Sequence, residues 1–162
     1  MGAGKTTVGR QLAARLSFPF FDSDHEIEKR TGVSVATVFE IEGEDGFRRR
    51  ESTVIAELLS LPTVVVATGG GAVLRPENRS QFAKANIVAY ISVDPKTLYE
   101  RTRHDRNRPL LQVADPLQKL TELNAIRDPL YRKVATCIVD GNRHNAKQIV
   151  EWLQQEILQC SA

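Results

Sequence analysis

Four short runs of almost uninterrupted apolar residues constrain the fold of this chain more than any other feature. Each run is rich in β-branched or aromatic residues and ends at an acidic residue or a glycine-rich turn. Strands that are apolar throughout, instead of alternating with polar residues, are typical of a parallel sheet covered by helices on both faces. The sequence therefore predicts an α/β fold. The four predicted strands are residues 18–21, 63–67, 86–93 and 136–140.

Helical segments separate these strands and leave polar motifs at the strand ends. Ligands of α/β folds bind at the carboxyl ends of the strands. Two polar motifs fall there, the acidic residues 22–24 and the glycines 69–71. The predicted helices are 5–16, 25–60 with interruptions at Gly32, Gly43 and Gly46, one that starts at Pro95, about 115–135, and 145–158.

Length and composition describe one globular unit, and we expect residues 1–162 to form a single domain. Hydrophobic residues make up 41% of the chain and charged residues 26%, which excludes a disordered tail. The net charge of +2 gives no argument for a nucleic-acid or membrane partner, and we expect neither. Two cysteines, Cys137 and Cys160, cannot build a disulfide framework or a zinc site, and free thiols fit a cytoplasmic protein.

The first seven residues, Met-Gly-Ala-Gly-Lys-Thr-Thr, match the end of a phosphate-binding P-loop. The full pattern is GxxxxGK[ST], and Gly4, Lys5 and Thr6 fill its last three fixed positions. Glycines let backbone N–H groups turn onto phosphate oxygens, and the following helix adds the positive end of its dipole. The lysine of such a loop reaches the β- and γ-phosphates, while the hydroxyl of the next residue ligates Mg²⁺. A chance Gly-Lys-Thr at a helix start is the alternative, but the acidic strand end nearby favours a nucleotide site.

Two aspartates, Asp22 and Asp24, flank Ser23 at the end of the first predicted strand. On an extended backbone both carboxylates point to the same side. Beside bound phosphates, one carboxylate can hold Mg²⁺ through water while the other takes a proton from a substrate hydroxyl. Asp24 can equally cap the next helix, and the residues alone do not choose between these roles.

Three consecutive arginines follow Phe47, and they cannot share one helical face. If one of them points inward, it needs an anionic partner. Arg48 can pair with Glu51 at i+3 on the surface, or it can hold a substrate carboxylate with its planar fork. The glycines 69–71, directly after a strand, indicate that something approaches the backbone closely. A flexible turn is the alternative there.

Basic residues gather twice more in the second half of the chain. A polar segment around 101–109 contains four arginines, and such a run is usually a solvated face. In a phosphoryl-transfer enzyme the same composition is typical of a lid that closes on ATP and supplies an arginine finger. A further arginine, Arg127, lies within a predicted helix just before Pro129. The arginines of the polar segment are Arg101, Arg103, Arg106 and Arg108.

In combination, these motifs resemble the shikimate kinase family, and the resemblance covers essentially the whole chain. The family consists of small P-loop kinases of the nucleoside monophosphate kinase type. The resemblance therefore implies a three-layer fold with five parallel strands in the order 2-3-1-4-5. It also implies transfer of the γ-phosphoryl group of ATP to the 3-hydroxyl of shikimate, on the route to aromatic amino acids. The matching segments are GAGKTT at 2–7, DSD at 22–24, FRRRE at 47–51, GGG at 69–71, RPLL at 108–111 and RDPLY at 127–131.

On the nucleotide side, the resemblance implies roles at the metal, at adenine, in the lid and at the phosphates. Thr6 and Asp22 would lie at Mg²⁺, and Arg101 and Arg143 near adenine. Arg108 would be the lid arginine that meets ATP, within a lid of about 101–113, and Lys5 would stabilise the transferring charge. The ATP phosphates would lie on Gly2, Ala3, Gly4, Lys5, Thr6 and Thr7.

On the substrate side, the resemblance implies a shikimate-binding segment at about residues 24–60. Asp24 would bind the shikimate hydroxyls and act as the base. The shikimate carboxylate would be held by Arg48, Gly70 and Arg127. We expect the protein to act as a monomer on these two small molecules.

Two alternatives and one departure from the family pattern remain. A gluconate kinase is also a P-loop kinase of a hydroxy acid, and a nucleotide-binding paralogue without activity would retain part of the loop. The departure is that the strand feeding the P-loop, and the first glycine of that loop, have no counterpart here. In the order 2-3-1-4-5 this is the middle strand. We therefore expect the sheet to lack strand 1, with Met1 at the place of an internal methionine, and the chain to be poorly folded or weakly active.

Overall fold

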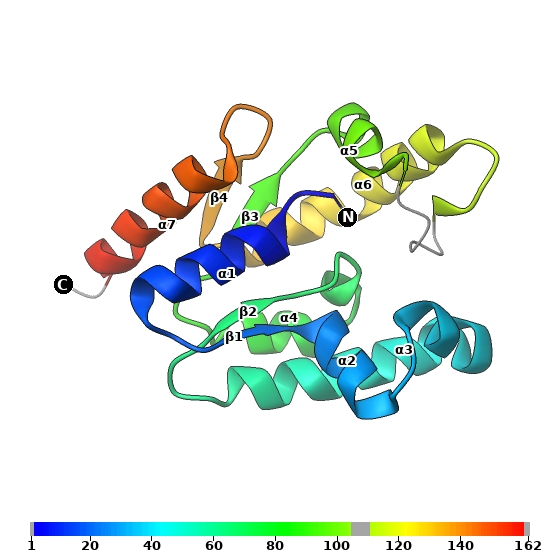
Figure 1. The fold of residues 1–162 in the computed structure, drawn as a ribbon, viewed down its shortest axis with the longest axis horizontal. Coiled ribbons are helices and arrows are strands. Elements are labelled where there is room, and N and C mark those ends of the chain that lie inside the picture. Colours follow the sequence, from blue (N-terminus) through cyan, green and yellow to red (C-terminus); the bar gives the residue numbers. More distant parts are fainter. Residues whose placement is uncertain (1, 105–110, 161–162) are drawn as a thin grey trace.

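The computed structural model describes residues 2–104 and 111–160, in which short strands alternate with helices (Figure 1). This confirms the α/β prediction. The strands are β1 (Phe20–Asp22), β2 (Val65–Ala67), β3 (Ala89–Ser92) and β4 (Cys137–Asp140). The helices are α1 (Lys5–Leu16), α2 (Ser23–Thr31), α3 (Val35–Leu59), α4 (Pro76–Phe82), α5 (Pro95–Thr102), α6 (Pro116–Val134) and α7 (Ala146–Cys160), with a 3₁₀ turn η1 (Ala72–Leu74).

The strands form two separate parallel pairs. In the first pair Phe20 lies opposite Val65 and Asp22 opposite Ala67. In the second, β3 pairs with β4 from Ala89 and Cys137 onward. Within the described residues no strand joins β2 to β3. This arrangement agrees with the order 2-3-1-4-5 if β1, β2, β3 and β4 are the strands numbered 2, 3, 4 and 5 in that order and the middle strand, number 1, is absent.

A cavity of about 760 Å³ lies between β2 and β3. Apolar side chains of both strands and of α1 line it, among them Val65, Ile91 and Leu12. Lys5 and Gly70 line the same cavity. The space between the two strand pairs therefore continues to the polar end of the fold, where the candidate site lies.

Helix α1 packs against both strand pairs, which gives the molecule three layers (Figure 1). On one side Val8 and Leu12 belong to a buried core with Ile91 and Val139. On the other side α1 contacts β1 and β2, whose opposite face packs on α3 through residues such as Phe47. Burying apolar side chains on both faces of each pair is the main stabilising contribution to such a fold.

Several element bounds differ from the sequence prediction for local reasons. Gly32 ends α2 and Gly43 interrupts α3, both with a positive φ near 70°, as expected for glycine. Gly46 does not interrupt α3, because its backbone is helical and it is buried within the helix. The first strand begins at Phe20 and not at residue 18. Helix α4 was not predicted, since its polar sequence PENRSQF carries no apolar period.

No helix among residues 2–104 and 111–160 is both long enough and apolar enough to span a membrane.

Candidate active site

The loop before α1 has the backbone geometry of an anion-binding turn. Gly2 and Gly4 have φ values of 73° and 82°, which L side chains rarely adopt. Gly4 is the N-cap of α1, and no side chain caps the first turn of this helix. A Cβ atom on Gly2 would lie 2.6 Å from Cγ2 of Thr102, so the loop also packs tightly on α5. The uncapped N-terminus of α1 and its helix dipole thus favour binding of a phosphate at this loop.

Thr6 and Asp22 meet beside this loop. The Thr6 hydroxyl donates to Oδ2 of Asp22 over 2.7 Å. The other carboxylate oxygen of Asp22 accepts from the backbone N–H groups of Asp24 and His25, which makes Asp22 the N-cap of α2. The alternative that Asp24 caps this helix is therefore wrong. Two hard oxygen donors at the phosphate loop fit Mg²⁺, which keeps several waters and takes few protein ligands.

Asp24 is turned toward the centre of the site. Its Oδ1 atom is buried and has no hydrogen-bond partner among the described residues. Burial raises the pKa of the Asp24 carboxyl above its ordinary value, and the charge of Asp22 adds to this effect, while Lys5 and Arg48 oppose it. Asp24 is thus a buried acceptor that stands within the electrostatic reach of both the phosphate loop and α3.

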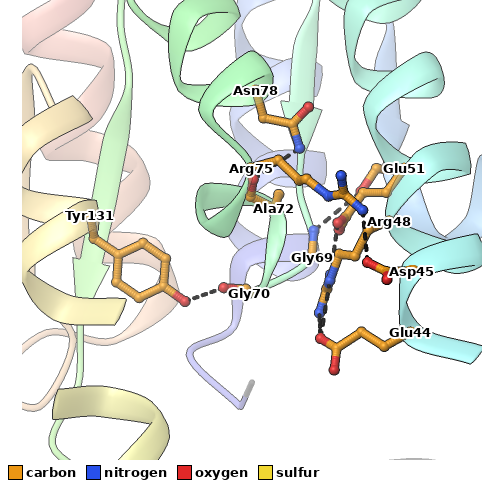
Figure 2. Close-up of polar contacts among 11 residues, drawn as sticks. Glu44, Asp45, Arg48, Glu51, Gly69, Gly70, Ala72, Arg75, Asn78 and Tyr131 are labelled. Carbon is orange, nitrogen blue, oxygen red and sulfur yellow. Dashed lines mark hydrogen bonds and ion pairs between the residues drawn. The ribbon is translucent and has the colours of Figure 1, made fainter. Parts of the chain in front are cut away.

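Arg48 is buried in α3 and pairs with two carboxylates (Figure 2). Its Nη1 atom lies 2.7 Å from Oε2 of Glu51, which is fully buried, and its Nη2 atom lies 3.1 Å from Oε1 of the exposed Glu44. The i+3 pair with Glu51 expected as a surface contact does form, but it is buried and not on the surface. Burial raises the pKa of Glu51, and Arg48 opposes the shift. The second oxygen of Glu51, Oε1, has no partner in the described part of the chain.

The glycine turn 69–71 is enclosed by these side chains. A Cβ atom on Gly69 would lie 2.6 Å from Oε1 of Glu51 and 2.9 Å from Oδ1 of Asp24. A Cβ atom on Gly71 would lie 2.5 Å from Nη1 of Arg48 and closer still to other atoms of its guanidinium group. The close approach predicted from three glycines in a row is therefore confirmed at both positions, and the alternative of a merely flexible turn is wrong.

The turn is also tied to its surroundings by hydrogen bonds (Figure 2). The N–H of Gly69 donates to the Ser23 hydroxyl over 3.1 Å. The side-chain amide of Asn78, on α4, donates to the carbonyl oxygen of Ala72 over 2.9 Å. From α6, the Tyr131 hydroxyl donates to the carbonyl oxygen of Gly70. Three helices thus fix a turn that has little side-chain bulk of its own.

Arg127, on α6, lines the same cavity as Gly69 and Gly70. It is 5% exposed, and its Nε atom is buried without a hydrogen-bond partner in the described residues. Its charge acts on both Glu51 and Tyr131. A buried guanidinium with an unused donor needs an acceptor, and a ligand carboxylate supplies one in the right geometry.

The two residues predicted near adenine, Arg101 and Arg143, come from α5 and from the loop between β4 and α7. Nη2 of Arg101 donates to the carbonyl oxygen of Gly141 over 2.9 Å. Arg143, two residues further along that loop, is exposed and lies 3.4 Å from Asp140. The structure therefore places Arg101 against the loop that carries Arg143. Arg108 and the central part of the predicted lid, residues 105–110, fall outside the described residues.

The model of the shikimate kinase family matches residues 1–158 of the chain. The chain belongs to this family. The shikimate kinase of Dechloromonas aromatica is 62% identical over 156 residues, which are 96% of this chain and 85% of that protein. The shikimate kinase of Neisseria gonorrhoeae is 53% identical over 97% of this chain and 91% of its own. The solved structure of shikimate kinase from Acinetobacter baumannii in complex with shikimate has a TM-score of 0.95 and 49% identity, covering 98% of this chain and 89% of that one. These matches do not favour the gluconate kinase alternative.

As a shikimate kinase, the chain brings its predicted residues together in two adjoining groups. The phosphate loop meets Asp22 through Thr6. Asp24 and Arg48 lie around the glycine turn, and Arg127, on α6, lines the same cavity as two of its glycines. Lys5 lies between the groups, since its charge acts on Asp24 and it lines the same cavity as Gly70.

Sequence reasoning missed two polar residues of this candidate site and misplaced a third. The two are Ser23, which anchors Gly69, and Tyr131, which holds Gly70, while Glu51 was expected to pair with Arg48 on the surface and holds it in a buried position instead. Each lies inside a motif quoted for the resemblance. The i+3 spacing from Arg48 to Glu51 and the i+4 spacing from Arg127 to Tyr131 were the signals available.

Proposed function

We propose that the protein transfers the γ-phosphoryl group of ATP to the 3-hydroxyl of shikimate. The observation that carries this proposal is a pair of buried guanidinium groups near Asp24: Arg48 lies against Gly71, and Arg127 lines the same cavity as Gly69 and Gly70. Such a site suits a small molecule with a carboxylate at one end and hydroxyls at the other. The solved relative from Acinetobacter baumannii, which is in complex with shikimate, supports the same ligand.

Arg48 and Arg127 would bind the shikimate carboxylate, together with the N–H of Gly70. Arg48 already has Glu51 and Glu44 as anionic partners, so its guanidinium is oriented before the substrate arrives. Arg127 retains an unpartnered Nε among the described residues. Charge-assisted hydrogen bonds to a planar carboxylate are strong and directional, so the two arginines would set the orientation of the ring.

Asp24 would then lie at the hydroxyl end of the substrate. Its buried, unpartnered Oδ1 can accept the proton of the 3-hydroxyl as that oxygen attacks the γ-phosphorus. The new bond joins this oxygen to phosphorus, the bond from the γ-phosphorus to the bridging oxygen of ADP breaks, and the proton remains on Asp24. A carboxyl whose pKa is raised by burial is a better proton acceptor at neutral pH than an ordinary aspartate.

The nucleotide would bind along the phosphate loop. The residues from Gly2 to Thr7 present backbone N–H groups and the N-terminus of α1 to the β- and γ-phosphates, and Lys5 adds its charge toward Asp24. We propose that Thr6 and Asp22 hold Mg²⁺, which when bound neutralises charge on the phosphates. Arg101 and Arg143 would contact adenine, and Arg108 would meet ATP from a lid of about residues 101–113.

We further propose that the protein acts as a monomer in the cytoplasm, without a membrane or nucleic-acid partner. Every group named above comes from one chain, so the site needs no second copy. Size-exclusion chromatography with light scattering tests the monomer directly.

A coupled assay of ADP release tests the proposed activity. Purified protein with ATP and Mg²⁺ is expected to release ADP when shikimate is added and not when gluconate is added. Omitting Mg²⁺ with a chelator is expected to abolish the signal. ADP release with gluconate, or none with shikimate from protein that gives a cooperative thermal melt, would contradict the proposal.

A further inference from the structure

Tyr131 is the one residue of the RDPLY segment that faces the glycine turn without a role in the proposed chemistry. Its hydroxyl donates to the carbonyl oxygen of Gly70 (Figure 2). Burial raises the pKa of this hydroxyl, so it remains protonated and acts as a donor across the physiological range. Arg127 lies one helical turn earlier on the same side of α6, so one helix presents a cation and a hydroxyl to the turn.

The carbonyl that Tyr131 holds controls a donor on the substrate side. The carbonyl of Gly70 and the N–H of Gly71 belong to one planar peptide group, so fixing the first fixes the second. Within the described residues, the N–H groups of Gly70 and Gly71 have no acceptor. They are therefore the free donors of the turn.

The rest of the turn does not fix this peptide group. The N–H of Ala72 donates to the carbonyl of Gly69 over 3.1 Å, and the N–H of Leu74 donates to the carbonyl of Gly71 over 3.0 Å. These bonds fix the Gly69–Gly70 and Gly71–Ala72 peptide groups, which lie on either side of the Gly70–Gly71 peptide group. Between two glycines, which have no Cβ atoms, the intervening peptide group rotates at little cost. Tyr131 supplies the bond that prevents this rotation.

Tyr131 is itself held in place by a second tyrosine. Its ring packs on Tyr90 of β3, with ring centroids 4.8 Å apart and an angle of 36° between the planes. The Tyr90 hydroxyl donates to Asp128 over 2.8 Å, and the other oxygen of Asp128 lies 2.7 Å from Arg132. The position of the Tyr131 hydroxyl is therefore set by β3 and α6 together.

We propose that Tyr131 is a positioning residue that orients the Gly70–Gly71 peptide group and thereby the N–H of Gly71, a second backbone donor to the substrate carboxylate in addition to the N–H of Gly70. The inference rests on the proposed function, because it concerns the same carboxylate site. Tyr131 touches neither the phosphate loop nor the proton acceptor, so its effect is on shikimate binding and not on the nucleotide.

The test compares Tyr131→Phe with Tyr90→Phe. Both variants keep the stacked rings and remove one hydroxyl, but only the first removes the bond to Gly70 and, with it, the interaction of that hydroxyl with Arg127. Loss of one hydrogen bond corresponds to about a fivefold change in an equilibrium constant. We therefore expect Tyr131→Phe to raise the shikimate KM, and the shikimate Kd measured by calorimetry without ATP, about fivefold or more, with the ATP KM unchanged. Tyr90→Phe is expected to leave both values unchanged.

An NMR experiment provides a readout that a general loss of packing would not reproduce. The ¹⁵N–¹H signals of Gly70 and Gly71 are expected to shift or broaden in Tyr131→Phe and to stay in place in Tyr90→Phe. An unchanged shikimate Kd in Tyr131→Phe would overturn the inference and leave the proposed function intact. Equal losses in both variants, or parallel rises in both KM values, would assign Tyr131 to packing alone. Failure of the unaltered protein to bind or phosphorylate shikimate would instead reject the proposed function.

Discussion

Replacing Gly71 with alanine displaces Arg48 without straining the backbone. Gly71 has φ −92° and ψ −3°, values that residues with a Cβ atom adopt at the third position of type I turns. The new methyl group would lie 2.5 Å from Nη1 of Arg48, whereas ordinary contact begins near 3.4 Å. The guanidinium group therefore has to move by at least about 1 Å, since two of its other atoms would lie closer than Nη1, although Glu51 and Glu44 hold it.

A displacement of this size acts directly on the proposed carboxylate contact. Misplacing a binding group by about 1 Å can cost as much as ~100-fold in rate, and loss of a buried charged partner costs about 2–5 kcal/mol. Since 1.4 kcal/mol corresponds to a factor of ten, we expect Gly71→Ala to lower kcat/KM for shikimate by roughly 30- to 100-fold. The ATP KM should remain unchanged, because the phosphate loop is untouched.

A double-mutant cycle with Arg48→Ala tests the physical cause. The alanine at position 71 has nothing to displace once the arginine is removed, so Gly71→Ala should have almost no further effect in the Arg48→Ala background. Steady-state kinetics at saturating ATP and thermal melting of all four proteins provide the data. Additive losses in the two single variants would show that the methyl group acts elsewhere and would refute this reasoning.

Two further predictions concern the buried carboxylate and the adenine side. Burial raises the folded-state pKa of Asp24 above its unfolded value of about 3.8. The folded state therefore binds this proton more tightly than the unfolded state does. The stability that the protonated carboxyl contributes is lost as the pH rises through the folded-state pKa. Asp24→Asn is therefore expected to raise Tm at pH 7 while abolishing turnover, and the gain in Tm should shrink as the pH falls toward 3.8. Thermal melts across this pH range test the prediction, and a lower Tm at pH 7 would contradict it. Arg101→Ala removes the donor to the Gly141 carbonyl. It should raise the ATP KM about fivefold and leave the shikimate KM nearly unchanged, which steady-state kinetics with each substrate varied in turn can measure. An unchanged ATP KM would show that Arg101 does not belong to the nucleotide site.

Motifs that depend on residue type could be predicted from the sequence. A glycine-lysine-threonine turn at a helix start has few structural uses, and α1 begins at Lys5 as expected. Three glycines after a strand required close neighbours, and Arg48, Glu51 and Asp24 are those neighbours. The place of the missing middle strand also followed from the family order, and it corresponds to the separation of β2 from β3.

Features that depend on three-dimensional packing could not be predicted. The pair of Arg48 and Glu51 has the spacing of a common surface contact, and only the packing of α3 against the turn buries it. Asp22 and Asp24 are chemically alike, and the turn into α2 decides which of them becomes the cap. Tyr131 acts through a backbone carbonyl that is distant in sequence, for which no side-chain pattern exists.

The position of α1 has a consequence for the molecule as a whole. This helix shares a core with β3 and β4 and also contacts β1 and β2, while its first turn is the proposed phosphate site. A nucleotide bound at that turn would therefore stabilise the packing of α1 against both strand pairs, β1–β2 and β3–β4. A ligand that binds only the folded state stabilises it by mass action, so saturating ADP should slow hydrogen exchange in β2 and in β3 alike, although neither strand touches the phosphate loop through a pairing of its own.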